Sequence, residues 1–140
     1  MKGEIPSFND VVAAMLALDF NPRMLDRIQQ ICGSVGDADL LVNALVARQY
    51  ELSPNQDTAL QAVYQSFEAL AEHNTEATCI LMAHFWPIAS TRVGMHEICD
   101  SIDLWISAHS GSSLTPHYRF LSESSGISEV KRHFSNLLSS

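Results

Sequence analysis

The sequence predicts an all-α fold: a single-domain bundle of about seven helices joined by short loops, formed by residues 1–140. Three observations lead to this prediction. Apolar residues recur at helical spacing along most of the chain, and helix-starting residues precede these segments. The six Gly and five Pro are too few for a protein made of strands and turns. With 46% hydrophobic residues, a chain of 140 residues can bury a core of its own.

The first two helices are predicted from the residues at their ends. Ser7, followed three residues later by Asp10, matches the capping box that starts a helix. Asn21 precedes Pro22 at the next start, and Gly33 follows the last turn. The residues expected to face the core here are Phe8, Val11, Val12, Met15, Leu18, Met24, Leu25, Ile28 and Ile31.

The next two helices have clear apolar stripes. The third is expected over about 37–49, and the fourth is expected to start with Ser53 as its cap, Pro54 in the first position and Gln56 as the capping-box partner. The inward residues are predicted to be Leu40, Leu41, Ala44 and Leu45 in the third helix and Leu60, Val63, Tyr64, Phe67, Leu70 and Ala71 in the fourth.

The second half of the chain is predicted to contain three more helices. One covers roughly 75–86 and is expected to end or kink before Pro87. Another covers about 91–109, and the last covers about 128–138. Between these two, only a short turn of helix is expected after residues 115–116. The last helix should face inward with Val130, Phe134, Leu137 and Leu138.

The net charge of −8 comes from the middle of the chain. Residues 49–118 hold eight acidic side chains and one basic one, which gives −7, whereas residues 1–48 carry −2 and residues 119–140 carry +1. A protein that binds phosphates needs clustered Lys and Arg. The charge pattern therefore argues against nucleic acid as a direct ligand and indicates a basic partner.

The three cysteines, Cys32, Cys79 and Cys99, have spacings that match no paired metal motif. They are expected to be buried free thiols in a reducing compartment. The chain begins without the apolar stretch of a secretory signal, and no apolar run reaches the roughly 20 residues of a membrane span. We therefore expect a soluble cytoplasmic protein that does not insert in a membrane.

The segment around His96 and Glu97 begins like the helix of a zinc protease. A second histidine would be required four residues after the first, and Asp100 stands there instead. His96, Asp100 and Asp103 still share one side of the helix and could hold a metal ion, although a solvated polar face is the more common arrangement.

Cys99 lies beside His96 and Asp100, as in a Cys-His-Asp set. Neighbours on one helix rarely reach the required geometry, because nucleophile, base and orienting group usually come from different elements. The chain also has no nucleophile elbow and no glycine-rich phosphate loop. We predict no catalytic residue, no metal and no cofactor.

The acidic face of this helix has the features of an interface. His96, Asp100 and Asp103 lie together with Glu97 at their border, and Leu104 falls among them. Acidic groups around an apolar residue suit a protein contact, since charge selects the partner and the apolar group is desolvated. The fourth helix adds an acidic face without local bases. The predicted partner-binding residues are His96, Glu97, Asp100, Asp103, Leu104, Asp57, Glu68 and Glu72.

The stretch "RVGMHEICDSIDLWI", residues 92–106, resembles sequences of small helical immunity proteins of bacterial contact-dependent growth inhibition and related polymorphic toxin systems. The size, acidity and lack of catalytic motifs of the chain are similar to theirs. This resemblance implies neutralisation of a cognate toxin, expected to be basic and of the nuclease type, by direct binding, and it transfers no functional residue.

Two other functions fit the same residues. The protein could be a helical adaptor or regulatory module that binds a protein or small ligand in a groove. It could also be a divergent metal-dependent enzyme that uses His96, Asp100 and Asp103.

Overall fold

The computed structural model describes residues 5–109 and 111–139, and this part of the chain folds into eight α-helices without any β-strand. The all-α prediction is confirmed, with one helix more than the seven expected. The α-helices are α1 (Phe8–Leu16), α2 (Pro22–Cys32), α3 (Val35–Leu52), α4 (Gln56–Leu70), α5 (Thr75–Ser90), α6 (His96–Ala108), α7 (Thr115–Ser124) and α8 (Ser128–Ser139). Two 3₁₀ turns, η1 (Val93–Met95) and η2 (Ser112–Leu114), precede α6 and α7.

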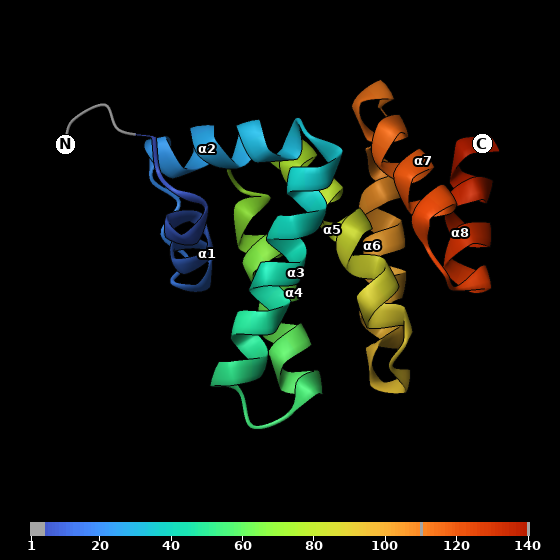
Figure 1. Ribbon diagram of the computed structural model, residues 1–140, viewed down its shortest axis with the longest axis horizontal. Coiled ribbons are helices and arrows are strands. Elements are labelled where there is room, and N and C mark those ends of the chain that lie inside the picture. The colour runs from blue at the N-terminus through green and yellow to red at the C-terminus, as the bar shows by residue number, and fades with distance from the viewer. Residues whose placement is uncertain (1–4, 110, 140) are drawn as a thin grey trace.

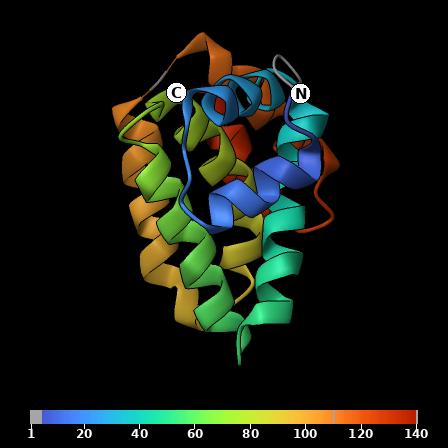
Figure 2. The same cartoon turned by 90° about the vertical axis from the view of Figure 1, so that its left-hand side faces the viewer.

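The helix α5 lies at the centre of the bundle. It packs against α2, α3, α4, α6 and α7, and most of its side chains are buried on all sides. A helix that is apolar all round belongs in a core. Figure 1 shows α2 lying across the ends of α3 and α4, with α7 and α8 side by side at the other end of the molecule. Figure 2 shows α1 packed across the outside of the α3 and α4 side.

One hydrophobic cluster contains buried residues from all eight helices. Its largest fully buried side chains are Phe67, Phe85 and Phe134, from α4, α5 and α8. Phe67 and Phe85 meet edge to face with ring centroids 5.6 Å apart, a favourable arrangement of two aromatic rings. None of the helices in residues 5–109 and 111–139 has the length and hydropathy that a membrane crossing requires.

The predicted starts of α1 and α2 are confirmed. Ser7 Oγ accepts from the Asp10 N–H at 3.1 Å, while Asp10 accepts from the Ser7 N–H at 3.0 Å. Asn21 Oδ1 accepts from the Met24 N–H at 3.0 Å, with Pro22 in the first turn. These bonds satisfy amide groups that a helix start would otherwise leave without a partner.

The predicted start of α4 is wrong. Ser53 ends α3, because its N–H already donates to the Gln49 carbonyl. Asn55 is the cap of α4, and its Oδ1 accepts from the Thr58 N–H at 2.8 Å. Pro54 therefore lies in the connection between the two helices and not in the first turn of α4.

Pro87 does not end α5, which continues to Ser90. The proline loses one backbone hydrogen bond, but the turn that follows it buries Ala89 completely in the core. Packing of this turn in the core thus outweighs the tendency of proline to end a helix. The next helix also begins later than expected, at His96. A third difference from the prediction concerns residues 115–124. Only a short turn was expected there, but these residues form the ten-residue helix α7.

Two leucines that were expected to face the core are exposed. Leu40 lies on the outer side of α3, 58% exposed. Leu18 follows the end of α1 with a φ of 56°, in the left-handed region. Its N–H donates to Met15, and the next N–H donates to Ala14, which closes the helix in the Schellman manner with leucine in the usual glycine position.

Candidate functional site

The polar face of α6 is the strongest candidate for a contact surface. His96, Glu97 and Asp100 are exposed, and Leu104 is 71% exposed among them. The opposite side of the helix is in the core, where Cys99, Ile102 and Ile106 are buried. An isolated exposed leucine is ordinary, but this one is surrounded by carboxylates on one helix face.

Asp103 differs from the rest of this face because α8 covers part of it. Its Oδ1 lies 3.0 Å from His133 Nε2, an ion-pair distance without hydrogen-bond alignment. The His133 ring stacks on Trp86 with ring centroids 3.9 Å apart. Asp103 therefore has an internal contact that Asp100 lacks among the described residues, and it is the least available of the predicted contact residues on α6.

The acidic residues of α4 also divide into two groups. Asp57, which was expected to have no nearby base, lies 2.6 Å from the Arg92 guanidinium. Arg92 donates to Gln56 as well, so the segment before α6 is tied to the start of α4. A Cβ added to Gly94 would lie 2.9 Å from the Asp57 carboxylate. Any other residue at this position would therefore have to displace the carboxylate, whereas glycine leaves it in place. Glu68 of α4 and Glu72, which follows the end of this helix at Leu70, are both exposed.

A shallow hollow of about 330 Å³ joins α4 to α6. Tyr64 and Glu68 of α4 and Leu104 and Trp105 of α6 line it, together with Ser101, Ala108 and His109. The hollow brings together Glu68 and Leu104, two residues predicted separately from two helices. Burial, followed by the nearby Glu68 carboxylate, raises the pKa of the Tyr64 phenol. Tyr64 was predicted to be a core residue, and its place in this hollow beside Trp105 was missed.

The cysteine hypothesis for catalysis is weakened by burial. All three cysteines are buried free thiols, as expected. Burial, with smaller contributions from Asp103, Asp100 and Glu129, raises the pKa of the Cys99 thiol to about 12. Since the thiolate is the nucleophile, the neutral thiol is poorly suited to attack at neutral pH. In residues 5–109 and 111–139, no three His, Cys, Asp or Glu side chains are grouped to hold a metal ion.

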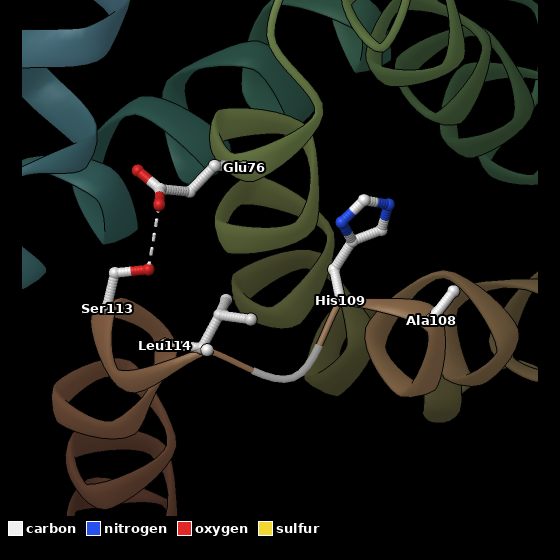
Figure 3. Close-up of a pocket in the computed structure, with 6 residues that line it drawn as sticks. Glu76, Ala108, His109, Ser113 and Leu114 are labelled. Carbon is white, nitrogen blue, oxygen red and sulfur yellow. Dashed lines mark hydrogen bonds between the residues drawn. The ribbon is translucent and has the colours of Figure 1, made fainter.

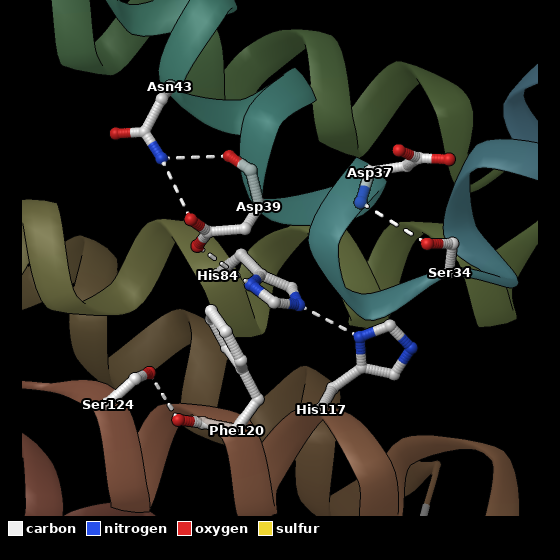
Figure 4. A network of polar contacts seen from close by, with 8 residues as sticks. All are labelled: Ser34, Asp37, Asp39, Asn43, His84, His117, Phe120 and Ser124. Atoms are coloured by element: carbon white, nitrogen blue, oxygen red, sulfur yellow. Dashed lines mark hydrogen bonds and ion pairs between the residues drawn. The ribbon is translucent and has the colours of Figure 1, made fainter.

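A second polar arrangement lies inside the bundle (Figure 4). Asp39 Oδ1 is 3.1 Å from His84 Nδ1, and His84 Nε2 is 2.8 Å from His117 Nδ1. These three residues come from α3, α5 and α7. Asn43 holds the carboxylate from the next turn of α3 by donating to Asp39 Oδ2 at 3.3 Å. We call Asp39, His84 and His117 the buried polar chain.

The buried polar chain has the components of an acid–base relay, but the ring nitrogens of both histidines are occupied by protein atoms. His117 also bonds the backbone carbonyl of Cys32, so that its two ring nitrogens both face protein atoms. Burial, reinforced by the neighbouring His84, lowers the pKa of His117 to about 4. The chain is suited to joining three helices. His84 within the apolar run "ILMAHFW" was the only hint of it in the sequence.

Comparison with known proteins adds no relative. The chain has no significant match to a protein-family model, to a curated protein or to a solved structure.

Proposed function

We propose that this protein is a non-enzymatic acidic binding protein of the cytoplasm that acts as an immunity protein. In this proposal it neutralises a basic toxin domain, of the nuclease type, by direct contact. The contact surface is the exposed face of α6 around Leu104, with Glu68 of α4 beside it.

The observation that carries the proposal is the position of Leu104. It is 71% exposed, Glu97 and Asp100 flank it on α6, and Glu68 lines the same hollow. In protein interfaces a desolvated apolar anchor supplies binding energy, and surrounding charges select the partner and steer its approach. A nuclease must expose basic groups to hold phosphates, so its active site is complementary to such a surface.

The described part of the hollow beside Leu104 has no charge that would repel such a toxin. Its lining residues among those that the structure describes include no Lys or Arg. Asp57 contributes less than the sequence suggested, because Arg92 neutralises it within the fold. Asp103 is partly withdrawn by its contact with His133. The proposed contact set is therefore His96, Glu97, Asp100 and Leu104 on α6, with Glu68 in the adjoining hollow and the exposed Glu72.

The proposal expects a toxin gene directly upstream, and the test is whether this protein protects cells from that toxin. The double variant Glu97→Lys/Asp100→Lys should lose protection and should bind the purified toxin with an association rate about tenfold lower at low salt. Both positions are exposed, so the variant should fold, with a loss of stability of at most about 1 kcal/mol because Glu97 lies in the first turn of α6.

A matched control variant changes the net charge by the same amount at positions outside the proposed contact surface. Asp19→Lys/Glu123→Lys alters two acids away from α6 by the same amount and should protect normally. Full protection by the Glu97/Asp100 variant, or equal loss in the control, would contradict the acidic-face proposal.

A further inference from the structure

The hollow beside Leu104 does not stand alone. It shares Ala108 and His109 with a second hollow of about 300 Å³, which Glu76 and Ser113 also line (Figure 3). The second shares Glu76 and Ser113 with a third hollow of about 360 Å³. Neighbouring hollows have lining residues in common, so the three adjoin one another, and we call them together the furrow.

The furrow runs past several helices that are distant in sequence. Its first part lies between α4 and α6, and its middle part lies at the first turn of α5. The last part is bordered by the end of α2 and the start of α7, where His117 of the buried polar chain is one of the lining residues. Adjoining hollows of this kind offer successive positions to a long ligand.

The charges along the furrow have one sign. Glu68 lines the first part and Glu76 lines the other two, and both are exposed. Among the described residues that line the three hollows there is no Lys or Arg. Glu76 Oε2 accepts a hydrogen bond from Ser113 Oγ at 3.0 Å, which orients the carboxylate but leaves its charge in place.

Apolar side chains also line each of the three hollows. Leu104 and Trp105 lie in the first part, and Leu114 lines the second. Val35 and Ile80 line the third. An occupant complementary to this lining carries cationic groups together with apolar ones.

We propose that the furrow binds an extended segment of the partner protein, with Lys or Arg side chains facing Glu68 and Glu76 and apolar side chains between them. An extended chain advances about 3.3 Å per residue and presents side chains in succession, which suits three adjoining hollows. The inference rests on the proposed function and specifies which part of the partner is held. It adds Glu76, His109 and Ser113 to the contact residues.

The probe is a fluorescein-labelled nine-residue peptide with the repeat Lys-Leu-Gly, titrated with the full chain and followed by fluorescence anisotropy. Glu68→Gln/Glu76→Gln should weaken binding of the peptide about tenfold, since the variant loses two negative charges that attract the lysines of the peptide. The amide oxygen introduced by Glu76→Gln can still accept the Ser113 hydroxyl, so the local structure is kept. The control Asp19→Asn/Glu123→Gln has the same net charge and should change binding less than about twofold.

Amide chemical shifts locate the peptide. Shifts at Ala77, His109 and Leu114 are expected on titration with the wild-type chain. Equal weakening in the control, or shifts only outside the furrow, would show general attraction to an acidic protein and overturn the proposal.

The two proposals fail separately. If Glu97→Lys/Asp100→Lys abolishes protection from the toxin while Glu68→Gln/Glu76→Gln leaves toxin affinity unchanged, the immunity function stands and the furrow proposal is wrong. If the furrow variant weakens the peptide but no neighbouring toxin is neutralised, the furrow remains a site for basic segments and the immunity function is wrong.

Discussion

The buried polar chain and the acidic face of α6 are both polar, yet they are satisfied in opposite ways. His84 and His117 are almost completely buried and meet Asp39 and each other inside the protein. Glu97 and Asp100 are exposed on α6. A buried polar group needs a protein partner because leaving it unpaired is costly, whereas an exposed carboxylate keeps its water.

The difference indicates where stability and binding reside. Groups that bond one another within the core hold α3, α5 and α7 in position. Groups that bond only water remain available to another molecule. Variants of the buried polar chain should therefore change folding, and variants of the acidic face should change association. Three measurements on stability can separate the regions.

The largest effect is expected from His84→Ala. The change opens a cavity in the core and removes the group that lies between Asp39 and His117, so the free energy of unfolding should fall by ~3 kcal/mol. Urea denaturation measures it. The exposed His96→Ala is the matched control on α6 and should stay within ~0.5 kcal/mol of wild type. Similar losses in both variants would remove the distinction between the regions.

The next effect is a dependence of stability on pH. The pKa of His117 is lowered to about 4, while the unfolded chain has the ordinary value of about 6.5. Between these values the unfolded chain binds the extra proton and the folded chain does not. The contribution of His117 is therefore complete above pH 6.5 and is lost as the pH falls towards 4, by up to ~3 kcal/mol.

His117→Gln isolates this contribution. Denaturant unfolding at several pH values should show a smaller loss of stability between pH 6.5 and 4 than wild type shows, although the variant starts from a lower stability. The pH dependence of stability that remains in this variant comes from other titrating groups. An unchanged slope in His117→Gln would mean that burial of this imidazole does not set the acid sensitivity.

The smallest effect compares two acids on one helix. Asp103 faces His133 at 3.0 Å and is partly covered, whereas Asp100 is exposed. Asp103→Ala should lower the free energy of unfolding by ~1 kcal/mol, and Asp100→Ala should change it by less than ~0.5 kcal/mol. Parallel thermal unfolding at neutral and mildly acidic pH checks this. Equal values would place Asp103 with the freely exposed acids.

Much of the fold follows from local patterns. The capping residues Ser7 and Asn21 and the apolar stripe of α4 depend on neighbours within one or two turns, and the structure confirms them. The errors occur where distant contacts outweigh local preference. The turn after Pro87 is held by burial of Ala89, and α7 is longer than its residues suggested because it packs along α8.

The candidate site divides in the same way. The sequence by itself determined which side of α6 is polar and that Leu104 stands among carboxylates, because helical spacing decides which residues share a face. Only the tertiary structure decided that Asp103 lies against His133 and that Asp57 pairs with Arg92. The same holds for the hydrogen bond between the histidines of α5 and α7. Each of these pairs joins residues of different helices or of the segments between them, so the packing of helices and not their spacing along the chain brings them together.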